Sequence, residues 1–313
     1  MFRRTAREGN KVTEQPGRLL NKPGNVRDLG YENVLVPLDG SDKASVAVAT
    51  ARALGDRLSA RVHAVAAVRT MDEGDSMRLR AAAALEIDPA DERVETVVSR
   101  SPALAISRRS AELAPCLVCM STSARGRFAG GVVRSIAEDV LRATDRPVMV
   151  VGPMADRRLY FERSRPTPLS IPRIVACVDV GHRSDPRAAH AAIAASAQWA
   201  TALDMSLTVL TVLQPTASSN NDDSELAVLE RLRRVVSEVC LDGPEVDVVV
   251  HTDPIGTKDG FAAHLAKRPA GLVVVSHPLR SGRLRRLMRG TTSTDIVRAV
   301  PAPTLIVPVG PAA

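Results

Sequence analysis

The stretch SIAEDVLRATDRPVMVV, from Ser135 to Val151, contains a helix signal followed by a strand signal. Ser135 and Glu138 have the spacing of a capping box, in which each side chain bonds to the other residue's backbone amide. Apolar residues then recur at helical spacing over two turns, which predicts an amphipathic helix. After Pro147 the run is apolar and β-branched, as in a strand that is covered on both faces.

The same pattern occurs twice in the chain and predicts its domain organisation. The opening stretch recurs as TTSTDIVRAVPAPTLIV at 291–307, and NVLVPLDGS at 33–41 recurs as RIVACVDVG at 173–181. Internal repeats of this length indicate two copies of one structural unit. Repeat and composition together predict a disordered basic tail at 1–30, a first domain at 31–153, a linker at 154–171 and a second domain at 172–311.

Each half alternates strand-like apolar runs with helix-like periodic runs, so we expect two tandem doubly wound α/β domains with five-stranded parallel sheets. Strands are expected near residues 33–38, 61–68, 93–98, 116–120, 147–151, 173–178, 206–213, 245–251, 271–276 and 303–307. Helices of the first half are expected near 42–57, 74–86, 102–114 and 135–144. Ligands of such sheets bind at the carboxyl ends of the strands. An unpaired apolar edge promotes aggregation, so the last strands of the two halves are expected to meet in an internal pseudo-dimer.

Composition argues against several classes of function. The chain has no apolar run near the roughly 20 residues of a membrane span, and its N-terminus lacks the apolar stretch of a signal peptide. We therefore expect a cytoplasmic protein that does not bind membranes. Most of the net charge of +7 lies in residues 1–30 and 154–172, and aromatic residues make up 2%. Specific nucleic-acid binding, which needs a basic stripe on a folded face, is not expected.

No residue pattern in the chain specifies a catalytic or metal site. Cys116 and Cys119 have C-x-x-C spacing, but they lie in a predicted strand where side chains three apart point to opposite faces. We predict buried structural thiols. His63 and His251 have no partners at metal-ligand spacing. The chain also lacks a P-loop motif, so a non-enzymatic protein is expected, with slow ATP hydrolysis as the alternative.

The quoted segments resemble the universal stress protein (UspA) family, and the chain from Tyr31 to Pro311 is similar to a tandem two-domain member. This resemblance implies two domains of the adenine nucleotide alpha hydrolase-like type that dimerise through their last strands. The family has one branch that binds ATP and one that does not. The ATP-binding branch carries G-x-x-G, nine residues, and then G-[S/T], because glycines let backbone amides approach the phosphates.

The second half keeps more of the residues that the family resemblance implies for nucleotide binding. Asp179 takes the acidic position that meets the nucleoside, and Val212 takes the aliphatic position that packs on adenine. Gly290 and Thr291 form the G-[S/T] pair. Histidine and Arg280 replace the first two glycines, and Gly282 two residues further on offers a shifted turn. Several arginines in this loop would attract phosphate.

The first half has lost more of the same pattern. Asp39 and Ser135 match the family, but Arg134 stands at the last glycine position and the small Ala67 at the adenine position. We therefore expect a degenerate first site.

The sequence then leaves two functions open. One is a regulatory protein of the stress response that binds ATP or another adenine nucleotide mainly through its second half, with the need for magnesium unknown. The other is an interaction module that binds no nucleotide and recruits a protein partner of unknown identity. A further homo-oligomer is compatible with both.

Overall fold

The alternation of strands and helices predicted for the first half is present in the structure. The computed structural model describes residues 29–122, 136–155, 169–181, 184–214, 224–241, 243–278 and 292–310. The strands of the first half are β1 (Asn33–Pro37), β2 (Arg61–Val68), β3 (Val94–Val98), β4 (Cys116–Ser121) and β5 (Val148–Val151). Its helices are α1 (Asp42–Leu58), α2 (Met71–Leu85), α3 (Pro102–Glu112) and α4 (Ile136–Ala143).

The second half repeats this order of elements. Its strands are β6 (Arg173–Cys177), β7 (Ser206–Leu213), β8 (Val246–Thr252), β9 (Leu272–Pro278) and β10 (Thr304–Val309). Its helices are α6 (Pro186–Leu203), α7 (Glu225–Val239), α8 (Thr257–Lys267) and α9 (Thr292–Ala299). Each strand begins and ends within two residues of the predicted position, because runs of β-branched residues bounded by polar turns mark strands clearly.

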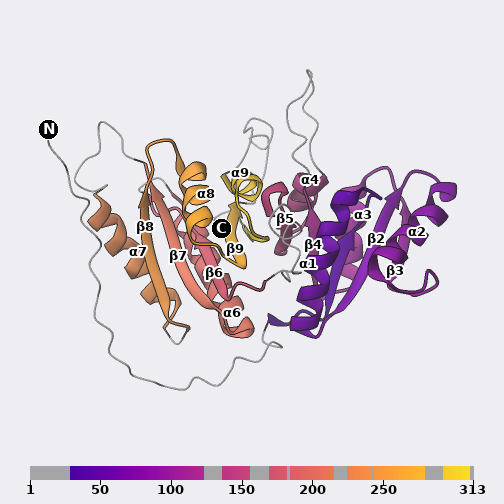
Figure 1. Ribbon diagram of the computed structural model, residues 1–313, viewed down its shortest axis with the longest axis horizontal. Helices are drawn as coiled ribbons and strands as arrows, with labels where there is room; N and C mark the ends of the chain where they lie inside the picture. Colours follow the sequence, from indigo (N-terminus) through magenta and orange to yellow (C-terminus); the bar gives the residue numbers. More distant parts are fainter. Residues whose placement is uncertain are drawn as a thin grey trace.

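The two halves share one ten-stranded sheet with the order β3-β2-β1-β4-β5-β10-β9-β6-β7-β8. Pairing is parallel within each half, whereas β5 and β10 pair antiparallel, with Val150 opposite Thr304 and Val148 opposite Ile306. The prediction that the last strands meet is confirmed. Figure 1 shows the two halves side by side, with α4 and α9 close together at the seam. Pairing these two strands leaves neither apolar edge bare.

Helices cover both faces of the sheet, and successive side chains of each strand enter different cores. Val34 and Val36 pack in the core beneath α1, α2, α6 and α7, whereas Leu35 packs in the core beneath α3, α4, α8 and α9. Both apolar cores run across the seam between the halves. A strand buried on both faces needs apolar residues at every position, which accounts for its nearly unbroken apolar run.

Helix α2 begins three residues before its predicted start. Thr70 has extended backbone angles, and its hydroxyl accepts a hydrogen bond from the Glu73 amide at 3.4 Å. The Glu73 carboxylate in turn accepts from the Arg69 amide at 3.0 Å. This reciprocal cap stabilises a first turn that is exposed at Met71, Asp72 and Glu73, so the periodicity of buried apolar residues that predicted the helix missed it.

Parts of the predicted tail and linker lie outside the described residues, namely 1–28 and 156–168. The ends of the predicted linker pack on the folded domains. Ala155 and Leu169 are buried, and the Arg57 guanidinium donates to the Leu169 carbonyl at 3.3 Å.

Cys116 and Cys119 are both buried in β4 and point to opposite faces of the sheet, as predicted. Burial raises the pKa of the Cys116 thiol to about 11 and that of Cys119 further still. A thiol with a raised pKa carries little thiolate at neutral pH, and thiolate is the reactive form. These two cysteines are structural.

Candidate functional site

Each half of the sheet has a switch point where a ligand is expected, called its corner below. At a switch point, two neighbouring parallel strands have connections that run in opposite directions. The order β3-β2-β1-β4-β5 makes β1 and β4 neighbours, although connections leave them in opposite directions; β6 and β9 repeat this arrangement. Such a switch point, at the carboxyl ends of the strands, leaves a crevice in doubly wound folds. Asp39 follows β1 and Asp179 follows β6 by two residues, so the structure places both at these corners.

Both aspartates are exposed and are held by the turn that follows them. The Asp179 Oδ1 atom accepts a hydrogen bond from the Gly181 amide at 2.9 Å. The Asp39 Oδ1 atom accepts from the Ser41 amide at 3.0 Å and from the Ser41 hydroxyl at 2.5 Å. These turns fix the carboxylates in place. A carboxylate has about four acceptor positions in total, so it can also accept bonds from ligand hydroxyls.

Val212 lies in β7, the strand adjacent to β6, which Asp179 follows. Cys177 pairs with Leu210 in the β6–β7 ladder, and both side chains belong to the core beneath α8 and α9. Since side chains alternate along a strand, Val212, two residues after Leu210 in β7, is directed to that same face. Asp179 lies beyond the end of β6, between Val178 and Val180, which both pack in the core on the opposite face. Val212 is half-buried and packs at the edge of the core beneath α8 and α9. The structure thus brings together a carboxylate and an apolar side chain at one corner.

The remaining predicted site residues lie outside the described residues: Ser135, Arg280, Gly282, Gly290 and Thr291. Their neighbours are placed at the expected edge. Strand β9 ends at Pro278 and α9 begins at Thr292, directly after the predicted G-[S/T] pair. Helix N-termini favour anions because their first amides are unpaired and the helix dipole is positive there. A role for these five residues stays a prediction.

Sequence reasoning gave no functional role to the second helix of each half, which reaches over the loop after the aspartate. In the second half, the Arg231 guanidinium of α7 donates to the Val180 carbonyl at 2.8 Å. In the first half, a Cβ on Gly40 would lie 3.0 Å from the Met77 sulfur of α2. Met77 and Arg231 are each the seventh residue of their helix. Aligning the two halves of the sequence by these helices therefore pairs the two positions. A Cβ on Gly40 would also lie 3.2 Å from the Arg80 Nη1 atom, so the second helix brings an arginine to this loop in both halves.

His277, which stands at a glycine position of the family motif, lies at the end of β9 and is partly buried. Burial lowers the pKa of this histidine, and the Arg142 guanidinium across the seam lowers it further. The imidazole is therefore neutral at pH 7 and adds no positive charge to the corner.

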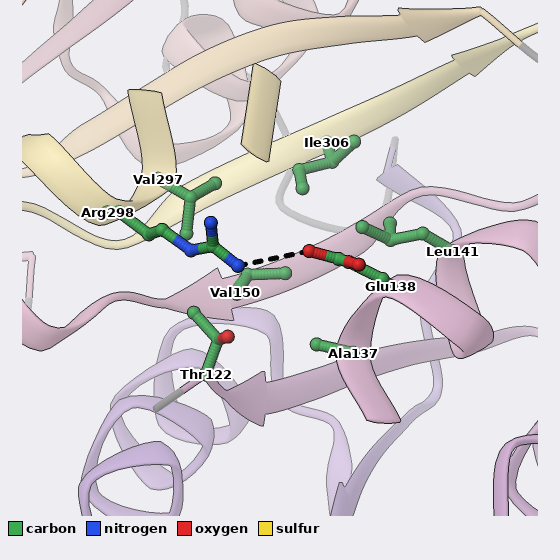
Figure 2. A pocket seen from close by; sticks show the side chains of 8 residues that line it. All are labelled: Thr122, Ala137, Glu138, Leu141, Val150, Val297, Arg298 and Ile306. Carbon is green, nitrogen blue, oxygen red and sulfur yellow. Dashed lines mark hydrogen bonds and ion pairs between the residues drawn. The ribbon is translucent and has the colours of Figure 1, made fainter. Parts of the chain in front are cut away.

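A separate pocket lies at the seam between the halves and was not predicted. It is small and partly open to solvent, and it is lined by Thr122, Ala137, Glu138, Leu141, Val150, Val297, Arg298 and Ile306. Glu138 and Arg298 point toward one another across it (Figure 2), with 3.0 Å between Oε1 and Nη2. Glu138, predicted to complete the capping box of α4, thus pairs with α9.

Within the described ranges, no group of three or more His, Cys, Asp or Glu side chains could hold a metal ion. Among the helices that the structure describes, none has both the length and the apolar character needed to cross a membrane.

The fold defines a class of protein: two doubly wound α/β domains, joined through their last strands, each with an acidic residue after its first strand. The profile of the universal stress protein family matches residues 30–152 and 170–308. The chain belongs to this family and is a tandem two-domain member. No curated protein matches the sequence.

Solved structures of other proteins have the same fold over most of the chain. A universal stress protein from Archaeoglobus fulgidus DSM 4304 has a TM-score of 0.58 at 15% identity, over 88% of this chain and 96% of the other. A putative universal stress protein from Pseudomonas aeruginosa UCBPP-PA14 has a TM-score of 0.58 at 16% identity, over 90% and 94%. A functionally unknown protein from Pseudomonas aeruginosa PAO1 has a TM-score of 0.56 at 14% identity, over 90% and 94%.

Proposed function

We propose that this universal stress protein is a non-catalytic regulator that binds ATP or another adenine nucleotide at the corner of its second domain. The arrangement of Asp179 and Val212 carries this proposal. Val212 lies in β7 and Asp179 follows the adjacent strand β6, both at the carboxyl edge, where doubly wound sheets bind ligands. The carboxylate would accept hydrogen bonds from the ribose hydroxyls, and the valine would pack on the base.

The differences between the two corners support binding to the second one. Val212 offers an apolar surface where the first domain has only Ala67. We further propose that Arg280, Gly282, Gly290 and Thr291 hold the phosphates ahead of α9. The first corner keeps Asp39 and Ser135 but carries Arg134 at the last glycine position.

Mass spectrometry of the natively purified chain tests the proposal directly. We expect an adenine nucleotide at close to one equivalent per chain, and calorimetry with ATP on the chain freed of that nucleotide should give the same stoichiometry. Asp179→Asn should weaken binding by about tenfold, the effect of roughly 1.4 kcal/mol, because a charge-assisted hydrogen bond is lost. Asp39→Asn is the matched control and should leave binding unchanged.

Two other results would point to the alternatives. A purified chain that contains no nucleotide and binds none would favour the interaction module, whose partner would then have to be sought. Steady-state ATP turnover that disappears in Asp179→Ala would show an enzyme.

A further inference from the structure

Helix α8 approaches β7 more closely than a residue with a side chain would allow, and Gly260 is the point of contact. A Cβ built on Gly260 would lie 2.6 Å from Val212 Cγ1 and 3.1 Å from Val212 Cγ2. It would also lie 2.9 Å from the Cβ of Asp253. Both valine methyl groups therefore occupy the space that a larger residue in α8 would fill.

The first domain has different residues at the two equivalent positions, one on the helix and one on the strand. Gly260 is the fourth residue of α8, and Ala105 is the fourth residue of α3. Their amides donate to the N-cap carbonyls of their helices, Gly256 at 2.9 Å and Ser101 at 3.1 Å. The strand position of Val212 is taken by Ala67 in the first domain. The first domain thus has alanine on both elements, and the second has valine on the strand and glycine on the helix.

Helix α8 cannot move away from β7 to make room. Phe261 and Leu265 anchor it in the core and are almost fully buried. The loop before it is held by Asp253, whose Oδ1 atom accepts from the amides of Ile255 at 2.8 Å and Gly256 at 3.3 Å. Close-packed interiors respond to an added methyl group by displacing the most yielding neighbour. That neighbour is the half-buried Val212, which faces the corner.

We propose that Gly260 is a positioning residue of the second domain's nucleotide site, admitting the Val212 side chain between α8 and β7 and so setting the surface that meets the adenine base. This inference rests on the proposed function of the corner. The chemical class of ligand that it selects is one with a flat apolar base, because Val212 contributes no hydrogen bond. The phosphates, held elsewhere, are not affected by Gly260.

The test compares a ligand with a base and a ligand without one. Calorimetry is done with ATP and with inorganic triphosphate on the full chain, together with thermal unfolding. Gly260→Ala should weaken ATP binding about tenfold, leave triphosphate binding unchanged and lower the melting temperature by a few degrees. The matched control is Gly74→Ala, the fourth residue of α2, where a Cβ would lie 3.5 Å from the Thr96 hydroxyl in ordinary contact.

A second variant separates packing from positioning. Val212→Ala combined with Gly260→Ala reproduces the residues of the first domain. It should recover the melting temperature but not the ATP affinity, because the apolar surface is absent. Unchanged ATP affinity in Gly260→Ala, an equal loss for both ligands, or recovery of ATP affinity in the double variant would each overturn the positioning role. If the unmodified chain binds no adenine nucleotide, the proposed function fails and the positioning role fails with it.

Discussion

The backbone of Gly152, just after β5, lies against the carbonyl group of Val297 in α9 of the other half. A Cβ on Gly152 would be 1.9 Å from the Val297 oxygen and 3.0 Å from its carbonyl carbon. Backbone atoms cannot rotate aside as a side chain can, so the seam accommodates only glycine here. We predict that Gly152→Ala lowers the free energy of unfolding by roughly 2 kcal/mol, the cost of overpacking. Urea unfolding measures this.

Gly310→Ala is the control for this prediction, because its Cβ would have no heavy atom within 4 Å. It should leave the unfolding midpoint unchanged. Equal unfolding midpoints for the two variants would show that the backbone at the seam shifts to make room for a methyl group at Gly152.

The ion pair between Glu138 and Arg298 joins α4 to α9 across the seam. Its side chains are 22% and 35% exposed, so solvent screens the pair only in part. We predict a coupling free energy of about 0.5 kcal/mol between Glu138→Gln and Arg298→Gln in a double-mutant cycle. The coupling should shrink in 1 M salt. A value of zero at low salt would mean that the pair contributes nothing to joining the halves.

Native thiol reactivity should distinguish Cys240 from the other three cysteines. Cys116, Cys119 and Cys177 are buried, whereas Cys240 is half-buried after α7. Burial raises the pKa of Cys240 as well, so its reaction should be slower than that of an exposed thiol. Titration with a chromogenic disulfide should give one equivalent in the native chain and four in denaturant. Native Cys240→Ser should show no reactive thiol, which would identify Cys240 as the thiol that reacts in the native chain.

Stability should decrease below about pH 6.5, and two buried histidines contribute to this decrease in addition to the partly buried His277. His63 Nε2 lies 2.9 Å from Asn33 Oδ1, and its buried Nδ1 has no hydrogen-bond partner among the described residues. The buried Nε2 atom of His264 likewise has no hydrogen-bond partner among the described residues. Burial lowers the pKa of both, and the arginines near each lower it further. Below pH 6.5 the unfolded chain therefore binds more protons than the folded one, which reduces stability as the pH falls.

Chemical unfolding between pH 7.5 and 5 measures this dependence. His63→Gln and His264→Gln should each flatten it, by at most about 1.4 kcal/mol per pH unit for one proton. The exposed His190, 3.5 Å from Glu238, gives the control variant His190→Gln. A slope that neither buried histidine changes would contradict this account.

The two nucleotide corners should respond differently to substitution. Gly290→Arg copies the arginine that the first half has at Arg134, and should abolish adenine-nucleotide binding because it puts a bulky side chain where backbone should meet phosphate. Ser135→Ala should leave binding nearly unchanged and cost about 1 kcal/mol of stability through loss of a helix cap. Calorimetry and urea unfolding measure the two effects. Equal loss of binding would indicate two working sites.

The elements and their order could be read from the sequence because their signals are local. The run Val148–Val151 indicates a buried strand, and the repeat of the opening stretch at 291–307 indicates a second copy of the unit. The opposite orientation of Cys116 and Cys119 follows from the period of a strand. The placement of Asp179 at the end of a strand follows from the apolar run that the sequence predicts as a strand near 173–178.

The contacts between elements were decided by the tertiary structure alone. Glu138 has the spacing of a helix cap, yet it pairs with Arg298, 160 residues away. Gly152 and Gly260 look like ordinary glycines in the sequence, but each lies where another element approaches too closely for a side chain. Local periodicity specifies which face of a helix is buried, whereas the partner of each side chain depends on how two elements dock. That docking depends on packing across the whole core, which no short stretch of sequence contains.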